Sequence, residues 1–239
     1  MVVLVTGSSR GIGAATIKEF ASHGYDVVIN YKNSLEDALM VQDSIKDYNV
    51  KSLVVKCDIS KENDVKDMVD TIIDEFGTID VLVNNAGIAI DTTFEDKTVS
   101  NFRHTLDVNL IGPFVLSRLV GDIMYKNKSG VIINISSTNG IDTTYPESLD
   151  YDASKAGIIS LTHNLAKQYA PYVRVNSICP GWVDTDMNKE LTIGFIEEEK
   201  SKILLNRFAN PEEIADAIYK VSTCTYVNDS IIRVDGGEK

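Results

Sequence analysis

The sequence predicts an open α/β fold: one doubly wound sheet of seven parallel strands with helices on both faces, formed as a single domain over residues 1–239. Short β-branched runs alternate along the chain with segments of helical periodicity, which is typical of βαβ units joined by right-handed crossovers. The first five runs are almost continuously apolar, as expected for strands buried on both faces of a parallel sheet. A chain of 239 residues commonly forms one such domain.

The expected strands are short runs rich in Val, Ile and Leu. They occupy residues 2–5, 27–29, 53–55, 81–83, 131–135, 173–178 and 231–234. The first run stops at Thr6-Gly7, which indicates a turn directly after it.

Helices are expected between these runs, at residues 11–23, 34–47, 61–76, 98–125, 150–170 and 211–222. Segment 61–76 is the clearest, because its apolar residues recur at helical spacing and form one face. Ser60 is placed to cap its start and Gly77 to end it. The charged segment 188–210 interrupts the alternation, and we expect it to cap a substrate site.

Composition excludes several classes of protein. With 23 basic and 35 acidic residues the net charge is −12, so the chain is not expected to bind nucleic acid. No 18-residue apolar run predicts a membrane span, and a strand at Val2 leaves no room for a signal peptide. Cys57, Cys179 and Cys224 are scattered, which favours reduced thiols and a cytoplasmic location.

No metal site is expected. His23, His104 and His163 fall on predicted helices without partners at metal-ligand spacing. Cys179 lies near the expected site, and packing is the better interpretation of it than nucleophilic chemistry.

A glycine-rich turn joins the first strand to the first helix. It reads Thr6-Gly7-Ser8-Ser9-Arg10-Gly11-Ile12-Gly13. Glycines at such a turn let the backbone approach a pyrophosphate, which then lies on the helix N-terminus. The spacing alone is weak, but its place between strand and helix favours a Rossmann-type dinucleotide site over a simple turn.

The end of the second strand indicates which dinucleotide binds. A carboxylate there would bind the ribose hydroxyls of NAD(H), but the residues are Asn30, Tyr31 and Lys32. Arg10 and Lys32 could instead flank a 2′-phosphate. The sequence therefore favours NADP(H) over NAD(H), against the alternative that both cations are simply solvated.

Tyr151 and Lys155 are four residues apart at the start of a predicted helix, so both side chains share one face. A nearby cation stabilises phenolate and lowers the pKa of a tyrosine, which allows acid–base chemistry. Such pairs also occur by chance on surface helices. Three other strand ends carry polar or glycine-rich motifs that should meet this pair at one edge of the sheet: Asn84–Gly87, Ser136-Ser137 and Pro180–Thr185.

Together these motifs resemble the short-chain dehydrogenase/reductase family along essentially the whole chain. The resemblance implies that Tyr151 is the proton donor or acceptor, and that Lys155 lowers its pKa and holds the nicotinamide ribose. It further implies that Ser137 polarises the carbonyl and that Asn109 completes a catalytic tetrad by holding a water. The implied cofactor contacts beyond the turn are Asp58, Ile59, Asn85, Ala86, Gly87, Pro180, Gly181, Val183 and Thr185.

Within the family the chain is most similar to the 3-oxoacyl-acyl-carrier-protein reductase branch, which implies a thioester ketone substrate and the acyl-carrier protein as a partner. It also implies a homodimer or homotetramer that pairs helices 98–125 and 150–170, although these could equally be core. Two features differ from the branch: Thr143–Glu147 replaces a small, glycine-rich stretch, and Tyr172 occupies a basic position.

Other functions stay open from the sequence. One is a dehydrogenase of a sugar, polyol or steroid alcohol, and another is a nucleotide sensor without turnover. The intact set Asn109, Ser137, Tyr151 and Lys155 argues against the sensor, because a sensor needs no proton relay. Trp182 could line the substrate pocket or simply pack.

Overall fold

The computed structural model describes residues 1–188 and 191–238. One parallel sheet of seven strands forms its centre, in the order β3-β2-β1-β4-β5-β6-β7. The strands are β1 (Val2–Val5), β2 (Asp26–Tyr31), β3 (Ser52–Lys56), β4 (Val81–Asn84), β5 (Gly130–Ile135), β6 (Val173–Pro180) and β7 (Ile231–Val234). The predicted doubly wound parallel sheet is confirmed.

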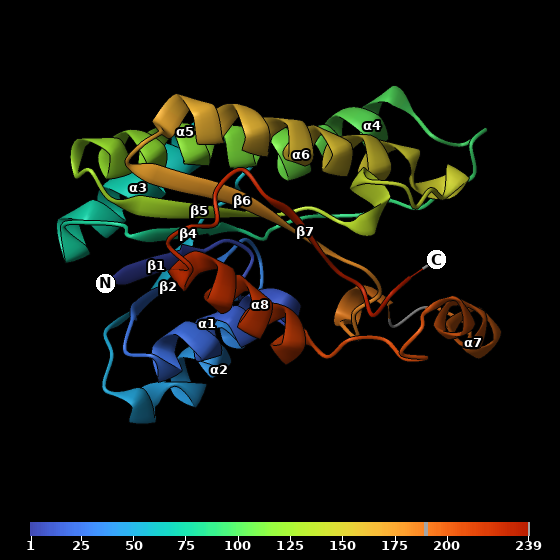
Figure 1. Cartoon of the computed structure of the whole chain (residues 1–239), viewed down its shortest axis with the longest axis horizontal. Helices are drawn as coiled ribbons and strands as arrows, with labels where there is room; N and C mark the ends of the chain where they lie inside the picture. Colours follow the sequence, from blue (N-terminus) through green and yellow to red (C-terminus); the bar gives the residue numbers. More distant parts are fainter. Residues whose placement is uncertain (189–190, 239) are drawn as a thin grey trace.

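Helices cover both faces of the sheet (Figure 1). One layer contains α1 (Gly11–Ser22), α2 (Leu35–Ser44) and α8 (Pro211–Thr223). The other contains α3 (Glu62–Phe76), α4 (Val99–Leu106), α5 (Gly112–Lys126) and α6 (Leu149–Tyr169). Helix α7 (Ile193–Lys202) lies apart from both layers, near the C-terminal stretch of the chain. The segment expected to form a cap thus contains a helix, while its residues 189 and 190 lie outside the described part.

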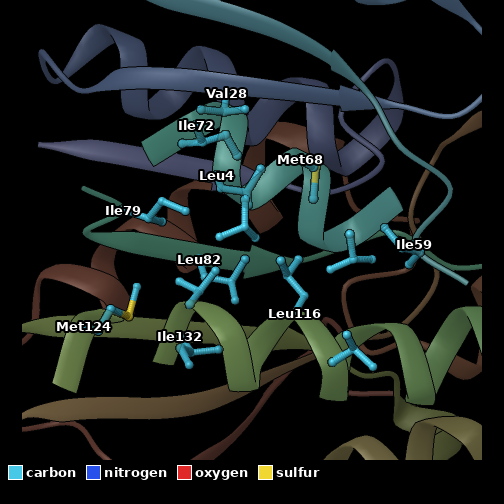
Figure 2. Close-up of a cluster of buried hydrophobic side chains, with 14 of the residues drawn as sticks. Leu4, Val28, Ile59, Met68, Ile72, Ile79, Leu82, Leu116, Met124 and Ile132 are labelled. Atoms are coloured by element: carbon cyan, nitrogen blue, oxygen red, sulfur yellow. The ribbon is translucent and has the colours of Figure 1, made fainter. Parts of the chain in front are cut away.

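A large apolar cluster fills the space between the sheet and the α3–α5 layer (Figure 2). Leu4, Leu82 and Ile132 project from neighbouring strands against Met68 of α3 and Leu116 of α5. Each of these side chains is at most 1% exposed. Burying one such side chain contributes roughly 1.5–3 kcal/mol, so this layer is a firm support for the loops at the strand ends.

The helix predicted at 98–125 is interrupted, which corrects its expected continuity. A π-helical turn, Asp107–Ile111, separates α4 from α5, and Gly112 donates its N–H to the carbonyl of Asp107. Pro113 follows and has no N–H to give to residue 109, so the ordinary helical hydrogen bond cannot form there. Single π turns of this kind often occur at functional sites.

The ends of α3 show one wrong and one correct capping prediction. The hydroxyl of Ser60 donates to Asp58 at 2.7 Å instead of capping the helix, whose N-cap is Lys61. Gly77 ends the helix as predicted, with a φ of 75° that suits glycine.

One segment, Val99–Lys126, is long and apolar enough to cross a membrane by length and composition alone, which the search for uninterrupted apolar runs missed. More than half of its most apolar part is buried inside the protein. Val115, Leu116, Val120 and Met124 belong to the core under the sheet. The segment therefore serves this fold as a core helix.

Candidate active site

The glycine-rich turn has the shape that a pyrophosphate requires. Gly7 and Gly11 have φ angles of +61° and +55°, which glycine adopts without strain. A Cβ on Gly13 would lie 2.6 Å from the carbonyl oxygen of Gly7 and 2.7 Å from Nδ2 of Asn85. The backbone therefore has room for no side chain here, and the N-terminus of α1 follows directly. The turn fits the phosphates of a dinucleotide.

The end of β4 is tied to this turn. The hydroxyl oxygen of Thr6 accepts from the backbone N–H groups of Asn85 and Ala86, both at 3.0 Å. Nδ2 of Asn85 donates to the carbonyl oxygens of Thr6 at 2.9 Å and Gly7 at 3.2 Å. Asn85 and Ala86 thus lie directly beside the glycine-rich turn, where the sequence analysis places them. The Asn85 side-chain amide fastens this segment to the turn.

Asn30 supports the turn from the other side, and its side chain is buried. Its Oδ1 accepts from the N–H of Gly7 at 3.0 Å, and its Nδ2 donates to the carbonyl of Cys57 at 3.3 Å. The amide thus serves the protein backbone and holds the turn, while the expected contact between Asn30 and a cofactor stays a prediction.

The two residues after Asn30 are more accessible. Tyr31 is partly buried at the end of β2, and Lys32 is exposed and lies 2.8 Å from the carboxylate of Asp58. Burial acts to raise the pKa of Asp58, but hydrogen bonds from Lys32 and Ser60 hold it below its usual value. Ile59 beside it is buried in the core cluster, so its side chain faces the protein interior.

Two cations accompany the outer side of the turn. Arg10 is exposed at the start of α1, and with Ser9 and Lys18 it lines a shallow cavity of about 250 Å³. Asp37 and Asp186 also line this cavity. An anionic group bound here would meet both positive and negative side chains, and Arg10 is the cation that belongs to the glycine-rich turn itself.

The loop after β6 covers the turn. A Cβ on Gly11 would lie 3.5 Å from the Thr185 methyl carbon, so the two predicted cofactor segments are adjacent. Val183 is buried and pairs with Ala209. Pro180 ends β6, and Gly181 follows it where a Cβ would approach Asp235 to 2.9 Å.

The four predicted catalytic residues come together at the same edge of the sheet. Tyr151 and Lys155 lie in the first part of α6, and the Lys155 ammonium is 5.3 Å from the centre of the Tyr151 ring. Lys155 also donates to the carbonyl of Ile135 at 2.9 Å, at the end of β5. Ser137 follows two residues later. A Cβ on Gly87 would lie 3.5 Å from Nζ of Lys155 and 3.4 Å from Oδ1 of Asn109. Asn109, the fourth predicted catalytic residue, therefore lies close to Lys155 and to the segment that follows β4.

The pKa of Tyr151 differs from the sequence expectation. Burial raises the pKa of this phenol to about 12, although a hydrogen bond with Ser137 acts to lower it. Burial also lowers the pKa of Lys155 to about 8. Burial therefore outweighs the hydrogen bond with Ser137, and the pKa of Tyr151 lies above its ordinary value instead of below it. At neutral pH the phenol holds its proton, as a general acid must.

Asn109 lies in the π-helical turn, and its side chain is fully engaged. Oδ1 accepts from the N–H of Ile88 at 2.8 Å, while Nδ2 donates to the Ile88 carbonyl at 2.8 Å and to the Ser154 hydroxyl at 3.1 Å. These bonds fasten the β4 loop to α6. Because Pro113 cannot donate to the main-chain carbonyl of Asn109, that carbonyl is the group suited to hold a water.

On the substrate side, helix α7 is fastened to the loops that flank the catalytic residues. Glu199 is buried, and its Oε2 accepts from the Tyr145 hydroxyl at 2.8 Å and from Nε1 of Trp182 at 3.2 Å. Trp182 stacks on Phe208 with ring centres 5.4 Å apart. Trp182 therefore packs within the cap. Glu199 could not be recognised from the sequence, because it lies in an ordinary run of charged residues.

The sequence analysis also missed Asn139 and Asp152. Each is close in sequence to a catalytic residue, but only the fold shows that their side chains join, with Nδ2 of Asn139 2.7 Å from the Asp152 carboxylate. Within residues 1–188 and 191–238, no cluster of three or more His, Cys, Asp or Glu side chains is arranged to hold a metal ion. His23 stacks on Tyr219, and His163 is hydrogen bonded to Asp229.

Comparison with known proteins gives consistent matches. The family model for short chain dehydrogenases matches residues 1–194. A 3-oxoacyl-[acyl-carrier-protein] reductase of Synechocystis is 38% identical, over 99% of this chain and 96% of that protein. The protein of the same name, FabG, from Staphylococcus epidermidis is 34% identical, over 98% of this chain and 97% of that one.

Solved structures agree with the fold. A dehydrogenase/reductase from Sinorhizobium meliloti superposes with a TM-score of 0.92 at 30% identity, covering 99% of this chain and 94% of that one. A short-chain type dehydrogenase/reductase from Mycobacterium marinum gives a TM-score of 0.92 at 31% identity, covering 98% and 94%. Sequence and structure therefore point to the same group of proteins.

Proposed function

The chain belongs to the short-chain dehydrogenase family, and we propose that it is an NADP(H)-dependent reductase that converts a ketone to a hydroxyl group, with Tyr151 as proton donor. The observation that carries the proposal is the placing of Tyr151, Lys155 and Ser137 beside a turn that fits a pyrophosphate. A nicotinamide dinucleotide, when bound there, supplies the hydride.

The side chains of the chain itself supply the proton and the electrostatics. Tyr151, with a pKa of about 12, keeps its proton at neutral pH and can give it to the ketone oxygen as negative charge develops there. The Lys155 ammonium stabilises the phenolate that forms when the proton leaves. The Ser137 hydroxyl donates to the same oxygen.

The preference for NADP(H) rests on charge at the end of β2. No carboxylate stands at residues 30–32 to bind ribose hydroxyls, and Arg10 and Lys32 are exposed on that side. A 2′-phosphate can form charge-assisted hydrogen bonds with such cations.

Introducing a carboxylate by Tyr31→Asp is expected to shift the preference toward NADH. The new charge would repel the 2′-phosphate and accept from ribose hydroxyls, so the ratio of kcat/KM for NADPH over NADH should fall about tenfold or more, equivalent to ~1.4 kcal/mol. Tyr31→Asn is the neutral control. Asn30 is unsuitable for this test because its buried amide holds the turn. If Tyr31→Asp, like Tyr31→Asn, keeps the wild-type ratio of kcat/KM for NADPH over NADH, this explanation of cofactor choice is contradicted.

We further propose a 3-oxoacyl thioester as substrate, which the names of the similar reductases support. The acyl-carrier protein is the corresponding partner, and Lys126 and Lys128 before β5 offer it a local basic patch on a chain of net charge −12. The same proposal includes a cytoplasmic location, which a cell-fractionation blot would test.

An assay of NADPH oxidation tests the substrate. We expect an acetoacetyl thioester to be reduced faster than simple diketones, keto-sugars or keto-steroids. Faster reduction of a keto-sugar or keto-steroid would move the protein to the alternative substrate class. No turnover of any ketone would overturn the proposed activity and favour a nucleotide sensor.

A homodimer or homotetramer is also proposed. Val99, Ile111, Phe114 and Tyr125 are large apolar side chains that are at least 40% exposed along the α4–α5 segment. Exposed apolar residues gathered on one segment are typical of an interface. Light scattering after size exclusion would show a monomer mass if this assembly does not form.

A further inference from the structure

Asn139 connects a partly buried acid, Asp152, to the hydroxyl of Ser137. It lies in the short 3₁₀ turn Thr138–Gly140 that directly follows Ser137. Its Nδ2 donates to Oδ1 of Asp152 at 2.7 Å, and its Oδ1 accepts from the Ser137 hydroxyl at 3.1 Å. Its backbone N–H donates to the same hydroxyl oxygen at 3.2 Å. One residue thus contacts the Ser137 hydroxyl twice and Asp152 once.

Asp152 fixes which end of the Asn139 amide faces Ser137. An ionised carboxylate only accepts hydrogen bonds, so the NH₂ group must point toward it and the carbonyl end toward Ser137. The reversed amide would set two oxygens against each other. The second oxygen of Asp152 accepts from the backbone N–H of Tyr145 at 3.2 Å, which holds the carboxylate itself in place. Burial raises the pKa of Asp152 above its ordinary value, although these two hydrogen bonds act to lower it.

The orientation of the amide determines where the single proton of Ser137 points. The hydroxyl gives this proton to Oδ1 of Asn139, while its oxygen accepts the Asn139 N–H. The hydroxyl is therefore held in one rotamer beside the proton donor. A ketone oxygen arriving between Tyr151 and Ser137 needs only a rotation about the Cβ–Oγ bond to receive the Ser137 proton.

We propose that Asn139, oriented by Asp152, is a positioning residue that holds the Ser137 hydroxyl ready for the ketone oxygen. This inference rests on the proposed reductase function. It separates the roles of neighbouring residues: Ser137 and Tyr151 touch the ketone, while Asn139 and Asp152 act only through Ser137.

A kinetic cycle tests this role. Asn139→Ala is expected to lower kcat for acetoacetyl thioester reduction about fivefold to twentyfold with KM changed less than about twofold, as for loss of one hydrogen bond that matters in the transition state. In a Ser137→Ala background the same substitution should have no further effect. A further loss of similar size in that background would overturn the proposal, because Asn139 would then act independently of Ser137.

The matched control is Asp142→Ala. Asp142 holds the same loop through two hydrogen bonds from Arg233, both at 2.7 Å, and none of its hydrogen bonds involves Ser137. We expect kcat in this variant to stay within about twofold of the wild type, whereas a drop as large as that of Asn139→Ala would show a general brace of the loop and overturn the proposal.

A measurement without substrate separates this inference from the proposed function. The side-chain ¹⁵N–¹H₂ resonances of Asn139, identified by their loss in Asn139→Ala, should shift in Ser137→Ala and in Asp152→Asn but not in Asp142→Ala. Unshifted resonances in both of the first two variants would overturn the hydrogen-bonded chain. Absence of turnover in the wild-type protein with shifted resonances would instead overturn the reductase function alone.

Discussion

Tyr151→Phe is expected to lower turnover about 10³-fold while NADPH binding survives. The substitution removes only the phenolic hydroxyl, so the partly buried ring and the packing of α6 remain. Without that hydroxyl the ketone oxygen keeps only the Ser137 hydroxyl as a hydrogen-bond donor, and an unassisted serine, with no base to take over its charge, is a poor acid for transferring the proton. Turnover should be measured with saturating acetoacetyl thioester, and binding by titration of NADPH fluorescence. Undiminished turnover would refute the assignment of Tyr151 as the acid.

Tyr169→Phe is the matched control for this substitution. Tyr169 is a buried tyrosine on the same helix, and burial raises the pKa of its phenol to about 12, as it does for Tyr151. Its hydroxyl donates to the Arg118 carbonyl at 3.2 Å and to Asp122 at 3.1 Å, among α5 residues. We expect Tyr169→Phe to retain wild-type turnover. An equal loss in both variants would mean that a buried hydroxyl matters for stability of α6 and not for proton transfer.

The fold could be predicted from the sequence because it depends on repeated local patterns. Residues 2–5 and 81–83 are apolar without alternation, and β1 and β4 are buried along their whole length. The π-helical turn at Asp107–Ile111 was not predicted, because the apolar spacing on both sides continues through it. Pro113 was the available signal, and its missing N–H explains the break.

The meeting of Asn109, Ser137, Tyr151 and Lys155 was also predictable, since the motifs near them follow strand ends that must meet at one edge. The pKa values of these residues could not be predicted. The pKa of Tyr151 depends on how completely the phenol is buried, and a spacing of four residues from Lys155 says nothing of burial. The role of the Asn30 amide was unpredictable for a similar reason: the sequence places Asn30 at the end of β2 but does not show that its amide turns inward to Gly7.

Lys97→Met is expected to lower the free energy of unfolding by about 3–5 kcal/mol at neutral pH. Lys97 and Asp150 form an ion pair at 2.9 Å, with side chains only 4% and 0% exposed. Thr105 donates to the other oxygen of Asp150 at 2.7 Å. Removing the ammonium leaves the buried Asp150 carboxylate with only the neutral Thr105 hydroxyl as a side-chain partner. The unpaired buried charge lowers the free energy of unfolding by more than the intact ion pair adds to it. Urea unfolding at fixed protein concentration measures the loss.

A matched control is Lys220→Met, which removes an exposed pair with Asp216 at 2.6 Å on α8. Such a surface pair is worth about 0–1 kcal/mol. An equal cost in both variants would contradict the special role of the buried pair. A second check replaces both partners, Lys97→Met with Asp150→Leu, and should recover much of the lost stability because no charge is then left unpaired.

The pH dependence of this effect has a definite sign. Burial acts to raise the pKa of Asp150, but hydrogen bonds from Lys97 and Thr105 hold it below its ordinary value of 3.8. In the wild type the carboxylate therefore stabilises the fold above that pH, and this contribution is lost as the pH falls through the lowered folded-state pKa. In Lys97→Met the pKa of Asp150 should rise instead, so the carboxyl takes up a proton on acidification. The difference in free energy of unfolding between variant and wild type then narrows.

Because Asp150 directly precedes Tyr151 in α6, the ion pair also fixes the start of the helix that carries the proposed proton donor. Loss of turnover in Lys97→Met should accordingly be partly reversed in the double variant, where the same helix start is packed without charge.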